Sequence, residues 1–426
     1  MVTKEYPRIG ERMYHTVLEN GLHVYVDAKP DFQKSYAFFA TNYGGMDMKF
    51  HLNGQWHDTP AGVAHFLEHK MFDTEDGNAL QDLAANGASP NAFTSFAITG
   101  YYFESTQKFY DNLKILLSFV SIPYFTPESV DKEQGIIGQE IRMIEDDPEN
   151  QVFYAMLAGL YGHHPIRTPI AGTIESISHI TADALYACHK AFYSPGNMVL
   201  CVAGDVDPEQ VCALAREILP GESGGEIQRD YGEPEPPAAA KSRTELKMEV
   251  STPIFQIGWK AERPADGDQR LKARLVGELA CEALFGTSSP LYAQLYTQGL
   301  LNASFAYGYE SYPGCAFLVA GGESKDPDAV GAAIAAEVLR VEREGVDEAL
   351  FHRLKRAAYG NWVRGLNSFD NICIETAQAH FAGMEYLRFP EVFDTIEKKD
   401  IEDCIRVYMK PAHTALAVVS PKEVDG

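Results

Sequence analysis

The chain of 426 residues has an ordinary globular composition, 45% hydrophobic and 23% charged, and its length favours roughly two to three domains. Its 60 acidic residues outnumber 36 basic ones, and the formal net charge of −24 argues against binding to nucleic acids or anionic membranes. The seven cysteines are scattered without a C-x-x-C pair, and neither a secretory signal nor a membrane-spanning run is visible. We therefore expect a cytoplasmic protein with buried, reduced thiols.

The N-terminal part of the chain predicts two strands followed by a helix. Apolar residues that alternate or cluster between turn signals indicate strands at 22–26 and 35–41. Thr59 is a plausible N-cap and Pro60 suits the first helical position, so we expect a helix from there to about Phe72. This helix carries the motif around which the chain is organised.

The motif is H-x-x-E-H, formed by His65, Glu68 and His69. Positions i and i+4 of a helix lie on the same face, so both imidazoles can reach one metal ion. A carboxylate beside zinc-bound water suits a general base, because it can take a proton as the water attacks a carbonyl. The order is the reverse of H-E-x-x-H and marks the inverzincin class. A surface helix that carries this pattern by chance is the alternative.

Strands and helices continue after the motif. Strand-like stretches at 91–94 and 99–106 could form a hairpin in an antiparallel sheet. Apolar residues recur at helical spacing over 109–120, and a long amphipathic helix is expected over 128–144.

A hydrolytic zinc site takes three protein ligands and leaves a fourth position for water. We choose Glu140 as the third ligand because it lies in a helix beside apolar neighbours, where a carboxylate is costly unless it is paired or metal-bound. Glu133, seven residues earlier, could hydrogen-bond a ligand imidazole. Ordinary exposed helix carboxylates are the alternative for both residues.

The rest of the chain suggests a duplication. The first half ends with helices and one buried strand, expected at 151–161, 182–192 with Thr181 as cap, 198–203 and 208–219. A Gly/Pro-rich stretch, residues 220–245, then indicates a linker. The second half echoes the first in the same order, at 255–260, 271–285, 305–309, 315–320 and 415–419. The helix at 271–285 falls where the metal helix should be but carries no histidine, so we place a zinc-binding domain at 1–219 and a homologous domain without zinc at 246–426.

Residues 58–69 resemble the zinc motif of the pitrilysin/insulinase family of peptidases, which includes the mitochondrial-processing-peptidase-like members. Further segments resemble the family in the right order, at 91–94, 133–140, 164–173 and 193–204. The resemblance covers essentially the whole chain. It implies an α+β fold of two homologous domains, each an antiparallel sheet with helices on one side, which together form half of a clamshell chamber for short or unfolded peptides.

The resemblance also implies roles for single residues. Zn²⁺ would be bound by His65, His69 and Glu140, with Glu68 as the catalytic base and Glu133 in support of the site. The backbone of Asn91 and Ala92 would contact the substrate, as expected when a peptide adds a strand to a sheet edge.

One segment departs from the family pattern. Active members use an arginine of the second domain, followed shortly by a tyrosine, to stabilise the tetrahedral intermediate. The corresponding segment, residues 288–300, contains no arginine, and Tyr296 stands at about the expected position. This implies a partner that completes the chamber, either a homologous subunit without zinc in a heterodimer or a second copy in a homodimer.

The sequence therefore predicts a cytoplasmic zinc endopeptidase subunit. A non-catalytic assembly subunit of the same fold, like the core subunits of respiratory complexes, is the alternative, although the intact zinc set argues against it. A third reading is a small-molecule lyase with an H-x-x-E-H site, but such enzymes are far shorter and have one domain.

Overall fold

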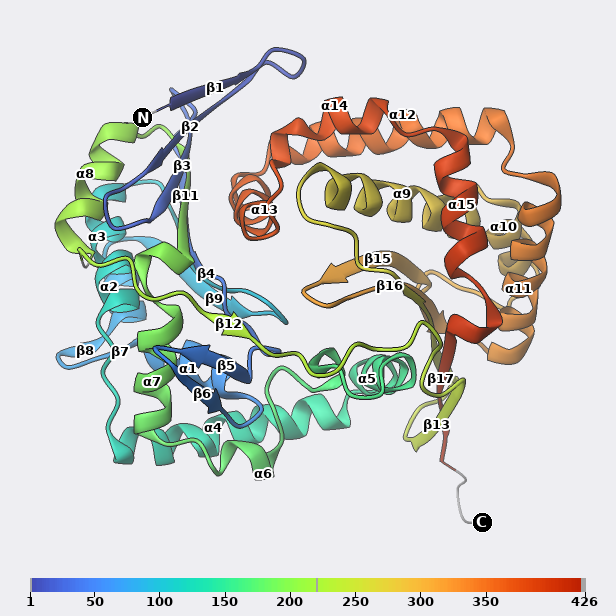
Figure 1. The fold of residues 1–426 in the computed structure, drawn as a ribbon, viewed down its shortest axis with the longest axis horizontal. Helices are drawn as coiled ribbons and strands as arrows, with labels where there is room; N and C mark the ends of the chain where they lie inside the picture. Colours follow the sequence, from blue (N-terminus) through green and yellow to red (C-terminus); the bar gives the residue numbers. More distant parts are fainter. Residues whose placement is uncertain (1, 220, 423–426) are drawn as a thin grey trace. The chain divides into compact units, whose positions relative to one another are not determined.

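The computed structural model describes residues 2–219 and 221–422, which divide into two compact units (Figure 1). The first unit combines Met1–Ile141, Thr168–Tyr231 and Trp362–Arg388. The second combines Arg142–Arg167, Gly232–Asn361 and Phe389–Gly426. Each unit joins its own antiparallel-dominant sheet with helices, so the predicted α+β class is confirmed.

The first unit is built on a seven-stranded sheet in the order β1-β2-β3-β11-β4-β10-β9. Its strands are β1 (Val2–Tyr6), β2 (Glu11–Val17), β3 (His23–Ala28), β4 (Ser35–Thr41), β9 (Ala88–Thr94), β10 (Thr99–Ser105) and β11 (Met198–Gly204). Neighbouring strands are antiparallel except β11 and β3, which run parallel. All strands predicted in this half are present, and β9 ends the strand order.

Helices and short strands complete the first unit. The helices are α1 (Val63–Met71), α2 (Ala79–Ala85), α3 (Phe109–Ser121), α6 (Ile174–Ile177), α7 (Ala182–Phe192), α8 (Pro208–Ile218) and α13 (Phe369–Phe381), and α4 (Pro127–Asp146) begins here. The short strands are β5 (Lys49–Leu52), β6 (Gln55–Asp58), β7 (Asp73–Thr74), β8 (Gly77–Asn78) and β12 (Gln228–Arg229), with 3₁₀ turns at Pro195–Asn197 and Tyr386–Arg388. The predicted cap of α7 is confirmed, because Thr181 Oγ1 accepts a hydrogen bond from the Ala184 N–H.

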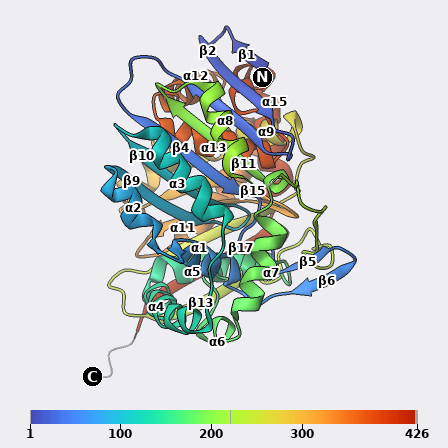
Figure 2. The ribbon, with the colours of Figure 1, turned by 90° about the vertical axis from the view of Figure 1, so that its left-hand side faces the viewer.

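The inner strand β4 is buried along its whole length because helices cover both faces of the sheet. On one face, Tyr36 and Phe38 cluster with Phe369 and Cys373 of α13. On the other face, α3 packs on β10 and β4 (Figure 2). Tyr101 of β10 meets Phe119 of α3 edge-on. The prediction placed helices on one side of each sheet, whereas the sheet of the first unit has helices on both sides.

The start of the motif helix differs from the prediction. Helix α1 begins at Val63, and its N-cap is Gly62 in the left-handed region, with φ of 94°. A Cβ on Gly62 would lie 2.5 Å from the carbonyl oxygen of Ala171, so this approach requires glycine. Thr59 does not cap the helix; its Oγ1 donates to the carbonyl of Met48, 2.9 Å away, which ties the loop before α1 to the residue that precedes β5. The predicted helical position of Pro60 is also wrong.

The second unit is built on a five-stranded sheet in the order β13-β17-β14-β16-β15. Its strands are β13 (Arg243–Met248), β14 (Ile254–Ala261), β15 (Ala306–Tyr312), β16 (Cys315–Glu323) and β17 (Thr414–Pro421), with β13 parallel to β17 and the other pairs antiparallel. The helices are α5 (Pro148–Leu160), α9 (Asp268–Phe285), α10 (Pro290–Thr297), α11 (Pro327–Glu344), α12 (Glu348–Gly365), α14 (Phe389–Asp394) and α15 (Lys398–Tyr408), with 3₁₀ turns at Pro165–Arg167 and Pro411–His413. Across residues 2–219 and 221–422, no helix has both the length and the apolarity needed to cross a membrane.

Each unit takes one helix from the other half of the chain. Helix α5 precedes the linker, yet it packs on β14 and β17, where Gly258 leaves room for Met156 and Leu160. Helix α13 follows the linker, yet it covers the sheet of the first unit. The compact units are therefore discontinuous in sequence, whereas the predicted domains, 1–219 and 246–426, are continuous. The homology of the two halves stays a proposal.

Residues 220–245, predicted as a linker, take part in both units over their described positions. Strand β12 pairs with β5 in the first unit, and the division between units falls after Tyr231. In the second unit, the Glu235 carboxylate accepts the backbone N–H groups of residues 162–164 and pairs with Lys260, 3.2 Å away. The segment is thus anchored by specific polar contacts in each of the two units.

Candidate metal centre

Helix α1 presents the motif on one buried face. His65 and Glu68 are buried, and His69 follows His65 by about one helical turn, so the two imidazole rings meet edge-on with centroids 4.6 Å apart. Apolar neighbours such as Phe66 and Leu67 are fully buried on the opposite side and fix the helix against the body of the unit. The polar stripe of α1 therefore has a defined orientation.

Helix α4 brings Glu140 to the same place. Its Oε1 lies 3.4 Å from His65 Nε2, and its Oε2 lies 3.5 Å from His69 Nε2. One ligand atom from each of the three residues can be chosen so that all lie within 4.8 Å of one another. Among the described residues, this is the one such group of three or more histidine, cysteine or acidic side chains. The predicted pairing of the motif with Glu140 is thus present in the geometry.

The three residues fit a zinc ion. Two imidazoles and one carboxylate form a known ligand set of hydrolytic zinc, and tetrahedral bonds of about 2.0–2.1 Å place neighbouring ligand atoms roughly 3.3 Å apart. The separations of 3.4 and 3.5 Å between Glu140 and the two imidazoles match this spacing. Nδ1 of His65 is buried without a hydrogen-bond partner, so Nε2, which faces Glu140, is the nitrogen available to a metal.

Glu133 holds the second imidazole. Its Oε1 lies 3.1 Å from Nδ1 of His69, and this contact leaves Nε2 of His69 directed toward Glu140. A carboxylate behind a ligand imidazole fixes the ring orientation and strengthens the ligand. The supporting role predicted for Glu133 has this geometry in its favour.

Carboxylates outnumber imidazoles around the site. Burial lowers the pKa of His69, but the hydrogen bond to Glu133 and the charges of Glu68 and Glu140 outweigh it, so the pKa is raised. The hydrogen bond and charge of His65, with His69, hold the pKa of Glu140 below its usual range against the opposing effect of burial. This excess of negative charge favours a divalent cation.

Glu68 lies beside the three-residue group and outside it. Its Oε2 accepts a hydrogen bond of 2.8 Å from Thr94 Oγ1 at the end of β9. This arrangement suits a base better than a ligand. Thr94 falls in a predicted strand, and no role is predicted for it from the sequence. The signal that could have found it is a hydroxyl at the end of the strand predicted to bind substrate.

Asn91 and Ala92 lie on β9, the last strand in the order of the seven-stranded sheet. Their partners on β10 are Tyr102 and Tyr101. The Ala92 N–H donates to Oδ1 of Asn91, 2.9 Å away. In the described part of the chain, no strand pairs with the other side of β9. Their contact with substrate stays a prediction.

Comparison with known proteins identifies the family. Residues 53–174 match the model of the insulinase family (peptidase family M16), and residues 179–358 match the model of the M16 inactive domain. The protein named uncharacterized zinc protease YmfH of Bacillus subtilis is 38% identical over 98% of this chain and 99% of its own. The chain belongs to the insulinase family of peptidases.

Solved structures agree with this chain in fold. A crystal structure described as an M16-like peptidase of Alicyclobacillus acidocaldarius superposes with a TM-score of 0.94 at 31% identity, covering 99% of this chain and 100% of that one. The periplasmic protease PqqL of Escherichia coli shares the fold, with a TM-score of 0.73 at 17% identity, over 96% of this chain and 48% of that one. The fold of this chain therefore occurs both in proteins of its own length and within a protein of about twice that length.

The segment in which the resemblance leads us to expect an arginine, residues 288–300, corresponds to α10 and its flanks. Ser289 caps α10, and the tyrosines Tyr292 and Tyr296 stack with ring centroids 5.8 Å apart. Tyr296 is 56% exposed, and residues 288–300 contain no arginine. The second half of this insulinase-family chain therefore lacks that cation at the position where the resemblance expects it.

Proposed function

We propose that the chain is the zinc-bearing subunit of an endopeptidase that hydrolyses short or unfolded peptides. The observation that carries this proposal is the convergence of His65, His69 and Glu140, with Glu68 beside them. Relatives named zinc proteases support it.

The residues of the site suit peptide-bond hydrolysis. When bound, zinc would polarise the substrate carbonyl and make the attacking water more acidic. Glu68 takes a proton from the water as its oxygen bonds to the carbonyl carbon, and gives the proton to the amide nitrogen as the C–N bond breaks. Glu133 keeps the His69 ring oriented through Nδ1.

The edge strand β9 suits an extended substrate. A peptide that pairs with β9 would form main-chain hydrogen bonds, which do not depend on the peptide's sequence. Such pairing requires an extended backbone, which a folded protein does not offer. In the structure, the Ala92 N–H is satisfied by the side chain of Asn91, a local bond that a substrate carbonyl could replace. We therefore assign backbone recognition to Asn91 and Ala92.

The absence of an arginine in residues 288–300 leads us to propose a partner. A homologous subunit without zinc would supply the missing cation and close the chamber in a heterodimer; a homodimer is the second arrangement. We place the complex in the cytoplasm, which the seven unpaired and buried cysteines support.

The decisive test uses the purified chain, with and without a homologous partner, and a library of quenched fluorescent peptides. We expect one zinc per chain and a loss of kcat of about 10²–10⁴-fold in Glu68→Gln, because the general base is removed. Glu282→Gln on α9 is the matched control and should keep activity. Undiminished cleavage by Glu68→Gln would refute the mechanism, and full activity of the lone monomer would refute the need for a partner.

A non-catalytic assembly subunit is the second candidate, favoured by the match of residues 179–358 to a model described as an inactive domain. Metal analysis separates the two, because an assembly subunit has no need of zinc. A chain that binds no zinc at micromolar concentrations would support the second candidate.

A further inference from the structure

Thr94 lies where it can control the orientation of Glu68. Its Oγ1 donates to Oε2 of Glu68 over 2.8 Å, joining the edge strand β9 to the motif helix α1. Glu68 is only 8% exposed, so a neighbouring hydroxyl can restrict its carboxylate more strongly than bulk water would. With Oε2 held in this way, Oε1 is the oxygen left to receive a proton.

Thr94 is itself held by the hairpin that joins β9 to β10. It stands opposite Thr99 in the register, and the two hydroxyl oxygens are 3.4 Å apart. Thr99 Oγ1 is buried and donates to the Tyr43 carbonyl over 2.9 Å. The turn end of the hairpin is therefore tied to the loop that follows β4.

The same loop clamps the tip of the hairpin through the backbone. The Gly45 N–H donates to the Ser95 carbonyl over 2.9 Å, and the Met46 N–H donates to the Phe96 carbonyl over 3.0 Å. A Cβ on Gly44 would lie 2.4 Å from the Ala97 nitrogen, so the two backbones approach more closely than any side chain allows. Backbone contacts of this kind leave little freedom to the strand end that carries Thr94.

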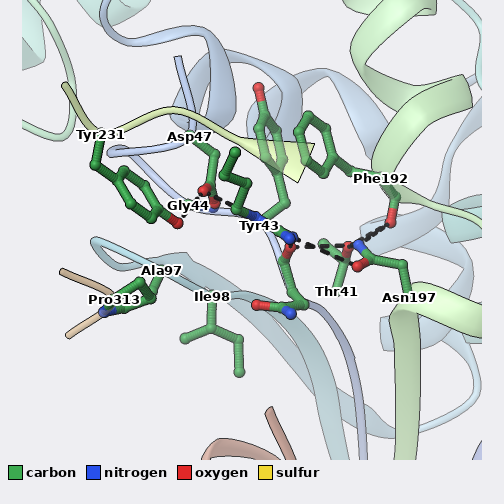
Figure 3. A network of polar contacts seen from close by, with 12 residues as sticks. Thr41, Tyr43, Gly44, Asp47, Ala97, Ile98, Phe192, Asn197, Tyr231 and Pro313 are labelled. Atoms are coloured by element: carbon green, nitrogen blue, oxygen red, sulfur yellow. Dashed lines mark hydrogen bonds and ion pairs between the residues drawn. The ribbon is translucent and has the colours of Figure 1, made fainter. Parts of the chain in front are cut away.

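A buried carboxylate fixes the clamping loop. Oδ2 of Asp47 accepts the Gly44 N–H over 2.8 Å, and Oδ1 accepts the Tyr231 hydroxyl over 2.8 Å (Figure 3). Arg229 Nε lies 3.0 Å from Oδ1 of Asp47. Residues that sequence analysis assigns to a linker thus support the loop, the hairpin and Thr94 in turn.

We propose that Thr94 is a positioning residue that holds Glu68 in the orientation needed to take a proton from the attacking water. This inference rests on the proposed peptidase function. Thr94 does not touch the reacting atoms; it acts through the carboxylate of Glu68. A carboxylate that points the wrong way slows proton transfer, and a displacement of about 1 Å can lower the rate roughly 10²-fold. Substrate binding does not depend on this orientation, so we expect KM to change little.

The experiment compares Thr94→Val, which keeps the shape but removes the donor, with Thr94→Ser, which restores it. We expect Thr94→Val to lower kcat by about 10–100-fold with KM changed less than about twofold, and Thr94→Ser to recover most of kcat. Zinc content should stay at one per chain in both. Thr106→Val, at an exposed threonine just after β10, is the matched control and should behave as the unmodified protein.

A crystal structure of zinc-loaded Thr94→Val supplies a readout independent of activity. We expect the Glu68 carboxylate to leave its position in the variant and to regain it in Thr94→Ser. An unmoved carboxylate, or kcat within about twofold of the unmodified protein, overturns the positioning role and leaves the peptidase function intact. If the unmodified chain cleaves no peptide with or without a partner, the proposed function fails. The position of the Glu68 carboxylate in the crystal structures then decides by itself whether Thr94 orients it. Thr94→Ala replaces Thr94→Val if the valine variant does not fold.

Discussion

The two units share an architecture but differ in chemistry. Both sheets contain one parallel pair followed by antiparallel strands, and both accept a helix from the other half of the chain. Helices α1 and α9 both begin after a glycine at positive φ, Gly62 and Gly267, without a side-chain cap. The two units are therefore similar both in their sheets and in how these two helices begin.

The difference lies in what each helix presents. On α1, Glu68 accepts from Thr94 of β9; on α9, Glu282 accepts from Tyr307 of β15 over 2.6 Å. Both helices therefore join an edge strand through a carboxylate and a hydroxyl. Only α1 also carries two histidines that meet a carboxylate from another helix. A shared architecture supplies positions, while single residues decide whether a position can hold a metal.

The largest expected effect concerns zinc. We expect His65→Ala to reduce bound zinc from one per chain to near zero, because two ligands cannot hold the ion at a hydrolytic site. His352→Ala, at a 58% exposed histidine side chain of the second unit, should keep the zinc. Metal analysis of both variants checks this.

Chelation should distinguish the units in the same way. Loss of a bound ion removes the stabilisation that binding adds to the folded state. Hydrogen exchange should quicken in α1 and β9 after EDTA treatment, with α9 and β15 unchanged. Equal quickening in both units would contradict the assignment of the metal to the first.

The next effect concerns the two anchors of residues 220–245. Asp47 in the first unit binds Arg229 and Tyr231 of the segment, whereas in the second unit Glu235 of the segment binds Lys260. Asp47→Asn removes the negative charge that pairs with Arg229, and Glu235→Gln removes the one that pairs with Lys260. Each variant leaves a largely buried cation without its counter-charge, so we expect each to lower the free energy of unfolding by about 2–4 kcal/mol. Urea unfolding measures this.

The anchors also predict which unit responds. Asp47→Asn should increase exchange in the β9–β10 hairpin, while Glu235→Gln should increase it in β14 and at residues 162–164. The control is Glu348→Gln, at an exposed ion pair with Lys398, which should change stability by less than about 1 kcal/mol. A loss confined to the same unit in both variants would contradict the separate anchors.

The smallest effect is a pH dependence of the first unit. His15, His23 and His380 lie together, with His23 and His380 ring centroids 4.3 Å apart, and His380 also contacts the Tyr25 hydroxyl. Burial, followed by the neighbouring imidazoles, lowers the pKa of His15 and His380 to about 4, and burial lowers the pKa of His23. Lys4 further lowers the pKa of His15, whereas Glu385 opposes the decrease.

The sign follows from the neutral imidazoles of the folded state. In the unfolded chain a histidine binds a proton near pH 6.5, so the stability present above that pH is lost as the pH falls from 6.5 toward 4. His380→Gln should reduce this loss, which urea unfolding between pH 7.5 and 4.5 measures. An identical pH dependence in the variant and the unmodified chain would show that the three histidines do not contribute to the pH dependence of stability.

Local sequence patterns determined most elements and the centre of the site. The strand at 35–41, the helix Ala182–Phe192 and its cap Thr181 follow from alternation, helical spacing and capping chemistry, which act within a few residues. His65, Glu68 and His69 share one face because helical geometry alone places them there. Together with the resemblance, this was enough to choose Glu140 71 residues further along.

Tertiary structure decided what local patterns cannot carry. The N-cap at Gly62 depends on the approach of Ala171, and the exchange of α5 and α13 depends on which sheet face each helix covers. The contact of Thr94 with Glu68 requires a hairpin to be held against a helix by Asp47, whose partners are 182 and 184 residues away. Such contacts arise from packing between distant segments, and no periodicity in the sequence records them.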